Sequence, residues 1–264
     1  MLREFARQRF GVILGRSTCR HYFHRLGFVL KRPKKQLLKA DPARRAEFVR
    51  AYALLWATAQ ATGAKIFFAD EAHFYADADL RGQWVLKGEP ALVDSTSPRW
   101  GEQVSYYSAV CLETGEVEVM ELEGNSSAAT SVEFLKQLRA QHGEPLVVIW
   151  DNGPAHGGEA MRDYLATPDL HLRLVRLPAY SPDFNPDEKI WGWVREEATA
   201  NTCFGTRVAV RAAVGRFFAT LRERTEEVAR RCRTILQSAA GAHAPTVAAL
   251  LQDPQHVDPT LASV

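Results

Sequence analysis

The sequence has few cysteines and no long apolar run. Its four cysteines are Cys19, Cys111, Cys203 and Cys232, and no two of them form a Cys-x-x-Cys pair. A zinc site or a disulfide framework is therefore not expected, and the pattern is typical of a protein of the reducing cytosol. No stretch of about 18 consecutive apolar residues is present, so we expect no transmembrane helix and no membrane partner. The first ten residues carry three arginines without a following apolar segment, which is unlike a secretory signal.

The net charge of +2 hides an uneven distribution of charge along the 264 residues. Residues 1–50 contain 14 Lys and Arg against three Asp and Glu, a net charge of +11, and the remainder has a net charge of −9. A basic segment joined to an acidic body indicates a module that binds a polyanion attached to a domain that gathers carboxylates. The alternative from charge alone is a basic face that is merely solvated.

The basic segment has the pattern of a helix-turn-helix. A helix over residues 2–10 and a turn over 11–15 precede a second helix over 18–26, for which Ser17 is the expected N-cap and Gly27 the C-terminal stop. Residues 28–30 are expected to be extended, and a basic stretch follows at 31–35. Helix, turn, helix and a short extended piece are the layout of a winged helix-turn-helix.

The rest of the chain has the pattern of an α/β domain. Asp41 and Pro42 begin a helix that ends at Gly63. Strands are expected at residues 66–69, 84–86, 103–111, 116–122, 146–150 and 170–177, and helices at 131–141, 156–166, 185–199 and 207–239. A hairpin turning at residues 114 and 115, followed by alternating helices and strands, predicts a mixed sheet in a three-layer α/β fold.

Three acidic residues lie at the edges of these predicted elements. Asp70 follows the strand at 66–69, Asp151 follows the strand at 146–150, and Glu188 lies in the first turn of the helix at 185–199. If the two strands are neighbours, both aspartates meet at one edge of the sheet, where sites of open α/β sheets gather. A helix packed on the sheet would bring Glu188 to the same place.

Three clustered carboxylates indicate a divalent metal site. Mg²⁺ prefers oxygen ligands, and carboxylates gathered without a cation would repel one another. Two such ions can stabilise the attacking and leaving oxygens of an in-line displacement at a phosphate.

Each acid also has a plain structural interpretation. Asp70 and Glu71 fit ordinary acids at a strand end, and in an extended backbone only one of them faces a given site. Asp151 begins a stretch of turn-forming residues, Asp-Asn-Gly-Pro. Glu188 fits the third position of a capping box with Asn185 as N-cap.

Taken together, the motifs resemble those of DDE-type transposases, in the bacterial insertion-sequence branch of the mariner superfamily. The resemblance covers about residues 10–200 and rests on the text at 68–71, 81–84, 150–156 and, most specifically, 177–191, which reads LPAYSPDFNPDEKIW. The gap of 36 residues between Asp151 and Glu188 also looks like that of the family.

The resemblance implies an RNase H-like fold, a mixed sheet flanked by helices and preceded by a small winged helix-turn-helix remnant. It implies that Asp70, Asp151 and Glu188 hold two Mg²⁺ or Mn²⁺ ions, with Asn152 and His156 in supporting roles. Water would attack a phosphodiester at a transposon end, and the freed 3′-hydroxyl would attack target DNA, commonly at TA. Asp187 stands where the family tends to have an apolar residue, so it competes with Glu188 as the third ligand.

The family likeness also gives the basic segment a function in DNA binding. Residues 18–26 resemble a recognition helix, so the DNA contacts are expected at Thr18, Arg20, His21 and Arg25 in the groove and at Lys31, Arg32, Lys34 and Lys35 on phosphates. The expected organisation is a partial helix-turn-helix arm at 1–36, a connecting helix at 37–63, an RNase H-like catalytic domain at 64–200 and a helical extension at 201–264.

The expected partners are the DNA of the transposon ends and of the target, and a second copy of the chain on that DNA. Family members carry a further helix-turn-helix before this region, so either a separate polypeptide or frame supplies it or the chain is a trimmed copy. The expected location is the cytoplasm, at the nucleoid. Two alternatives stay open: an RNase H-like nuclease without strand transfer, and an inactive DNA-binding remnant. A glycosidase with paired carboxylates would leave the basic segment unexplained.

Overall fold

The computed structural model describes residues 2–29, 39–96, 102–234, 236 and 237. The chain divides into two compact units, Met1–Leu38 and Lys39–Val264. In the part of the chain that is described, no helix is long and apolar enough to cross a membrane.

The first unit contains two helices, α1 (Leu2–Phe10) and α2 (Arg16–Arg25). The expected helix at 2–10 is confirmed. The second helix begins two residues earlier than expected, with Gly15 as its N-cap, so Ser17 lies inside the helix and does not cap it. Gly27 ends the helix at a positive φ of 81°, as expected. Phe28 and Val29 form no strand, and the rest of the expected wing lies outside the described residues.

The second unit is built on one mixed sheet with the strand order β3-β2-β1-β4-β5. The strands are β1 (Lys65–Tyr75), β2 (Gln103–Cys111), β3 (Val117–Leu122), β4 (Leu146–Trp150) and β5 (Leu172–Arg176). β1 pairs antiparallel with β2, which forms a hairpin with β3, and it pairs parallel with β4, which pairs parallel with β5. The expected mixed sheet is confirmed.

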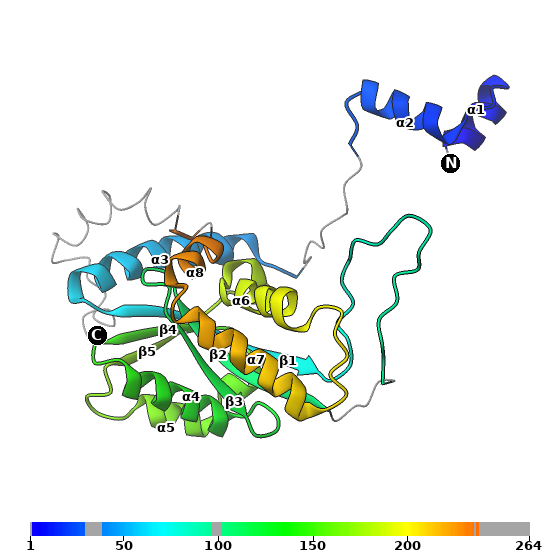
Figure 1. The fold of residues 1–264 in the computed structure, drawn as a ribbon. Coiled ribbons are helices and arrows are strands. Elements are labelled where there is room, and N and C mark those ends of the chain that lie inside the picture. The colour runs from blue at the N-terminus through cyan, green and yellow to red at the C-terminus, as the bar shows by residue number, and fades with distance from the viewer. Residues whose placement is uncertain (1, 30–38, 97–101, 235, 238–264) are drawn as a thin grey trace. The chain divides into compact units, whose positions relative to one another are not determined.

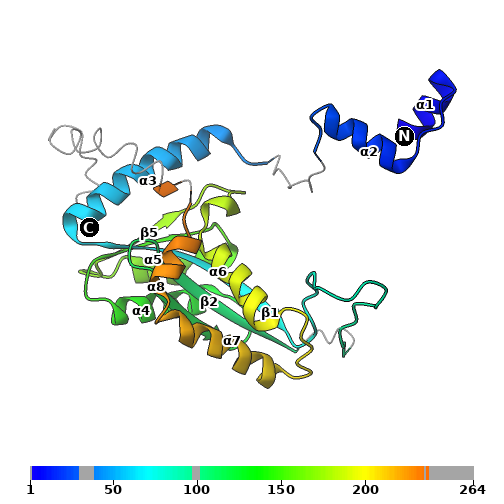
Figure 2. The same cartoon turned by 45° about the horizontal axis from the view of Figure 1, so that its top comes forward.

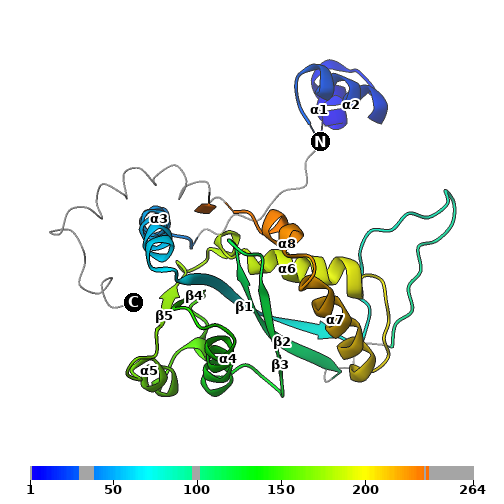
Figure 3. The ribbon, with the colours of Figure 1, turned by 60° about the vertical axis from the view of Figure 1, so that its left-hand side comes forward.

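Helices cover both faces of the sheet (Figures 1 and 3). On one face lie α4 (Ala128–Gln141) and α5 (Glu159–Leu165), packed over Phe67, Val148 and Trp150. On the other face lie α3 (Pro42–Thr62), α6 (Asp187–Val194), α7 (Arg207–Leu221) and α8 (Thr225–Arg231), which share a larger core with Phe68 and Phe74. Figure 2 shows α3 and α6 on the same side of the sheet. The expected three layers are therefore present.

Several expected boundaries differ from the structure. β1 extends to Tyr75 because it pairs with β2 along that whole length, so Asp70 lies inside the strand and does not follow it. Residues 84–86 form no strand, because they lie in an exposed loop without a pairing partner in the described residues. The expected helix at 156–166 begins at Glu159, after a 3₁₀ turn at Pro154–His156. The helix expected at 207–239 is interrupted between α7 and α8.

Replacement of Leu135, a fully buried residue of α4, tests whether the packing of this helix stabilises the sheet. We expect Leu135→Ala to lower the free energy of unfolding by about 2–5 kcal/mol, because the sheet cannot close the cavity that is left. Glu133→Ala, an exposed position of the same helix, should change it by less than about 0.5 kcal/mol. Urea denaturation of both variants measures the difference, and equal losses would contradict this packing.

Candidate active site

The strand register places Asp70 beside Asp151. β1 and β4 pair in parallel as far as Phe68 and Ile149, and two residues further along each strand stand Asp70 and Asp151. β4 ends at Trp150, whereas β1 continues with β2. The two aspartates therefore lie where the strands part, at the carboxyl end of β4, as the sequence predicted for neighbouring strands.

The N-terminus of α6 is tied to the same place on β1. Asn185 donates its side-chain amide to the carbonyl oxygen of Ala69 at 3.0 Å and accepts from the backbone N–H of Asp187 at 3.2 Å. The helix begins at Asp187, with Pro186 as N-cap, so the expected capping box with Glu188 at its third position is not formed. The two contacts of Asn185 bring the first turn of α6, with Glu188, next to Asp70.

Asp187 and Glu188 point in different directions. The Asp187 side chain is fully buried, and its Oδ2 accepts from the hydroxyl of Ser108, the residue of β2 opposite Asp70, at 2.5 Å. Glu188 is exposed. Of the two acids, Glu188 is therefore the one open to a substrate in solution, while Asp187 is engaged inside the core.

Burial near other carboxyl groups raises the pKa of Asp70, Asp187 and Glu188. Burial raises the pKa of Asp70 to about 9, and the neighbouring Asp187 and Glu188 contribute to that rise. Burial also raises the pKa of Glu188, Arg195 lowers it, and Asp151 raises it. Asp187, buried beside Glu188, has a pKa well above its ordinary value although its bond from Ser108 opposes the rise. The structure thus brings Asp70, Asp151 and Glu188 into one electrostatic cluster with little positive charge.

The residues after Asp151 form a tightly held turn. Asp151 Oδ1 accepts from the backbone N–H of Gly153 at 2.8 Å, and Asn152 donates its amide to the carbonyl oxygen of Leu177 at 2.7 Å. Asn152 therefore joins this turn to the end of β5. The buried His156 places Nε2 at 3.3 Å from Asp151 Oδ1. Arg176 of β5 donates to the carbonyl oxygens of Asp151 and His156.

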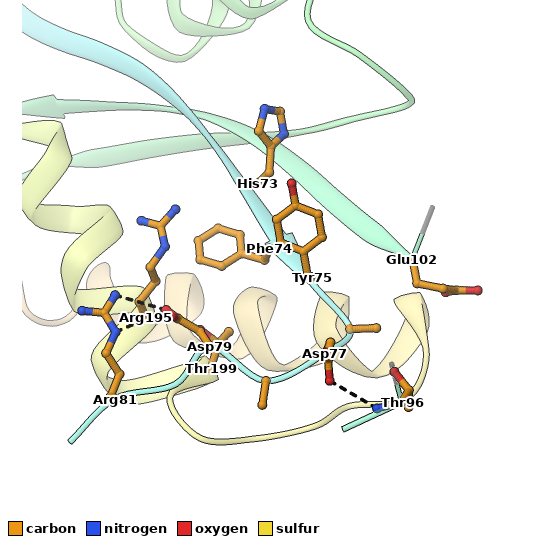
Figure 4. A pocket seen from close by; sticks show the side chains of 12 residues that line it. His73, Phe74, Tyr75, Asp77, Asp79, Arg81, Thr96, Glu102, Arg195 and Thr199 are labelled. Atoms are coloured by element: carbon orange, nitrogen blue, oxygen red, sulfur yellow. Dashed lines mark hydrogen bonds and ion pairs between the residues drawn. The ribbon is translucent and has the colours of Figure 1, made fainter. Parts of the chain in front are cut away.

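A cavity of about 510 Å³ opens at the carboxyl end of β1 (Figure 4). It is lined by the residues that follow Phe74 and by Arg195, whose guanidinium lies 5.2 Å from the centre of the Phe74 ring. Two of its acids have partners: Asp79 pairs with Arg81, and Asp77 accepts from the backbone N–H of Thr96. Asp70, Asp151 and Glu188 do not line this cavity, so the carboxylate cluster lies outside it.

The predicted DNA contacts are only partly described. Thr18, Arg20, His21 and Arg25 are all exposed on α2. The buried residue of that helix is Cys19. Lys31, Arg32, Lys34 and Lys35 lie outside the described residues.

Comparison with known families decides the identity of the chain. The sequence model of the DDE superfamily endonuclease matches residues 65–211, more than half of the chain and all five strands. The chain belongs to the DDE superfamily endonucleases. A winged helix-turn helix model matches residues 1–52 of this DDE endonuclease chain.

A curated relative of this DDE endonuclease comes from an insertion element. It is 26% identical over 194 residues to the insertion element IS630 uncharacterized 39 kDa protein of Shigella sonnei. The match covers 72% of this chain and 54% of that protein. The chain thus spans about half the length of this curated relative.

Solved structures of Mos1 share the fold. The pre-cleavage Mos1 transpososome matches with a TM-score of 0.63 and 16% identity, over 92% of this chain and 74% of that one. The Mos1 strand transfer complex matches with a TM-score of 0.59 and 18% identity, over 90% and 73%. The expected RNase H-like mixed sheet and the expected family are both confirmed.

Some residues of the DDE endonuclease site carry no clear sequence signal. Asn185 stands in the signature at 177–191, but its contact with Ala69 depends on the packing of α6. Glu71 lies 2.8 Å from His156 Nε2 across the turn that follows Asp151. Alternation along β1 indicates which face Glu71 occupies, but no pattern in the sequence pairs it with His156.

The raised pKa of Asp70 predicts how stability depends on pH when no divalent cation is present. The folded chain keeps a proton with a pKa of about 9 that an unfolded aspartate loses near 3.8. The contribution of Asp70 is therefore most favourable below pH 4, and stability is lost as the pH rises towards 9. Asp70→Asn cannot ionise, so its Tm should exceed that of the wild type by a margin that grows from pH 5 to pH 8.

Asp183→Asn is the matched control for this measurement. The side-chain bond from Arg45 lowers the pKa of Asp183, so this carboxylate contributes stability that is present at neutral pH and lost in acid. Its replacement should lower Tm at pH 8 by a margin that shrinks towards pH 3. Thermal denaturation in a chelator gives both series. A Tm of Asp70→Asn at or below the wild-type value at pH 8 would refute the electrostatic account.

Proposed function

We propose that this chain is a transposase that cleaves DNA at transposon ends and transfers the freed strand into target DNA, at TA sites. The observation that carries the proposal is the convergence of Asp70, Asp151 and Glu188 from three separate elements at the parting of β1 and β4. The family match and the signature at 177–191 support it. The likeness to proteins of an insertion element and of a strand transfer complex agrees with this chemistry.

The carboxylate cluster fits a pair of divalent ions, Mg²⁺ or Mn²⁺. In the side-chain positions of the described residues, no group of three His, Cys, Asp or Glu could hold a metal ion as it stands. The donors are nevertheless all oxygens, and burial, together with the neighbouring carboxyls of Asp187 and Glu188, raises the pKa of Asp70. Crystals of Mos1 paired-end complexes contain Mn and Mg.

The proposed mechanism assigns each residue a task. Bound divalent ions would supply Lewis-acid stabilisation of charge at the phosphate. Asp70 and Asp151 would bind them from the sheet, and Glu188 would complete the site from α6. Asn152 and His156 would support the site by holding the turn that carries Asp151. The buried Asp187 would stay outside the metal site and anchor α6 to β2 through Ser108.

The proposed partners are DNA and a second copy of the chain, with the DNA bound by α2 and the basic stretch at 31–35. The structures of similar fold include a Mos1 transposase paired-end complex. Within this chain, the loop after β1 exposes apolar side chains, Leu80, Trp84, Leu86 and Leu92, which a partner protein would cover. The proposed location is the cytoplasm, at the nucleoid. The domain limits at 36, 63 and 200, and a separate polypeptide that supplies a further helix-turn-helix, belong to the same proposal.

The catalytic assignment is tested by nicking of supercoiled plasmid in Mg²⁺ or Mn²⁺. We expect Asp70→Asn, Asp151→Asn and Glu188→Gln each to lose at least about a hundredfold in rate, since metal ions at such sites supply several kcal/mol of charge stabilisation. Asp163→Asn, an exposed aspartate of α5, is the control and should cleave normally. A triad variant that cleaves like the wild type would overturn the assignment.

Strand transfer separates a transposase from a nuclease. With DNA that carries the ends of the element as substrate, a transposase yields covalently joined products, whereas an RNase H-like nuclease yields only nicks and breaks. Binding by residues 1–35 without any cleavage would instead indicate an inactive DNA-binding remnant.

DNA binding by the first unit should depend steeply on salt. If about six of the basic side chains neutralise phosphates, the logarithm of affinity should fall with the logarithm of salt concentration with a slope of about −5. Arg20→Ala, on the exposed face of α2, should weaken binding by about 1–3 kcal/mol if it reads a base. Fluorescence anisotropy with a labelled duplex measures both, and a slope near zero would exclude phosphate neutralisation by this segment.

A further inference from the structure

Asp70 and Glu71 are adjacent in β1 and face opposite layers of the molecule. Asp70 interacts with Asp187 and Glu188 of α6. Glu71 lies on the side of α4 and α5, where its Oε2 is 2.8 Å from His156 Nε2. The sheet thus separates Glu71 of β1 from the two acids of α6. Glu71 nevertheless contacts the turn that carries Asp151.

The contacts of the His156 ring hold it in one position. It is fully buried and stacks on Trp150, with ring centres 4.1 Å apart and planes 21° apart. Its Nδ1 lies 3.1 Å from the hydroxyl of Ser131, which itself donates to the carbonyl oxygen of Ala155 at 2.8 Å. Tyr107 also lies edge-on to the ring, with centres 5.9 Å apart, so aromatic packing and Ser131 together fix the orientation of the ring.

The His156 Nε2 atom lies between two carboxylates. Glu71 Oε2 is 2.8 Å away and Asp151 Oδ1 is 3.3 Å away. An ionised carboxylate can only accept, so a hydrogen bond from the ring to either acid requires the proton to be on Nε2. Neither contact has the geometry of a hydrogen bond, and Nε2 and Glu71 Oε2 are both buried without a hydrogen-bond partner among the described residues. The two carboxylates therefore flank the same buried ring nitrogen.

Gly153 leaves just enough space for this arrangement. A Cβ on Gly153 would stand 2.9 Å from His156 Cδ2 and 3.0 Å from Asp151 Oδ1, closer than real contacts allow. The contacts of the described residues with the Asp151 carboxylate fall on Oδ1, from Gly153 N–H and His156 Nε2. This leaves Oδ2 for a cation.

We infer that Glu71, acting through His156, is a positioning residue for the Asp151 carboxylate. The inference rests on the proposed role of Asp151 as a metal ligand. Glu71 Oε2 is closer to His156 Nε2 than Asp151 Oδ1 is, so Glu71 competes with Asp151 for the ring N–H. The ring then fixes the position of Asp151 Oδ1 and leaves the other carboxylate oxygen free. Without Glu71, the N–H has Asp151 as its one carboxylate neighbour among the described residues, and Asp151 is drawn towards the ring and away from the cation.

The first test is Mn²⁺ binding to the full chain, followed by the electron paramagnetic resonance signal of free Mn²⁺. Glu71→Ala should weaken binding about tenfold, as expected when a partner of a ligating group is lost. Glu71→Gln should lie between Glu71→Ala and the wild type, because its amide oxygen can still accept from Nε2. Glu118→Ala is the matched control: Glu118 of β3 lies 3.4 Å from Nε2 of another buried histidine, His142. Its affinity for Mn²⁺ should equal that of the wild type.

Thermal denaturation accompanies each variant, because a merely structural Glu71 would lower Tm and leave Mn²⁺ affinity unchanged. That result overturns the inference, as does an equal loss of affinity in Glu71→Ala and Glu118→Ala.

A second measurement needs no metal. In the metal-free chain labelled with ¹³C at aspartate carboxyls, the Asp151 resonance, assigned with Asp151→Asn, should shift in Glu71→Ala and stay in place in Glu118→Ala. A chain that binds no Mn²⁺ but shows this shift would refute the proposed function and keep the positioning role of Glu71. An unmoved resonance overturns the role even where Mn²⁺ binds.

Discussion

β1 is shared by two partners of unequal length, and the rest of the site depends on this. It pairs with β2 over nine residues, from Phe67 to Tyr75, but with β4 over only four, ending at Phe68. Beyond that point β1 runs on with β2 alone, so an edge opens inside the sheet at Asp70. The turn after β4 and the first turn of α6 both enter this edge, and Asn185 fixes the latter to Ala69. β1, the turn after β4 and the start of α6 meet here because β1 extends beyond the end of β4.

The same edge concentrates negative charge that the protein only partly offsets. Ser108 donates to Asp187, Arg195 lowers the pKa of Glu188, and His156 faces Asp151 and Glu71. Burial of Asp70 near Asp187 and Glu188 raises its pKa to about 9, although a bond from the backbone N–H of Glu71 opposes the rise. A site of this kind costs folding stability until a cation or a substrate with cations occupies it, which is common where function requires like charges to be close.

Much of this architecture can be predicted from the sequence. The features that cannot be predicted in this way depend on contacts between segments that are distant in the sequence. The buried runs at 66–69 and 146–150 indicate central strands, and the motif spacing indicates the three acids. The polar pair Asp70 and Glu71 looks like a strand end, but hydrogen bonding to β2 carries the strand through it. Residues 84–86 have the composition of a strand and no partner. The contact of Glu71 with His156 joins residues 85 positions apart, and only the packing of the turn against β1 creates it.

Residues of the C-terminal helices α7 and α8 pack against α6, the helix that carries Glu188, so a fragment that keeps α6 in place must include them. Trp193 of α6 is buried between the guanidinium groups of Arg224 and Arg231, which lie 4.3 Å and 4.1 Å from its ring centre, and its Nε1 donates to Glu197. Phe217 packs edge-on against the same indole. Cutting the chain after α7 would remove both arginines and expose the indole of Trp193 to water. The smallest fragment that keeps this packing around α6 therefore extends to Arg231, 40 residues beyond the end of the signature at Trp191.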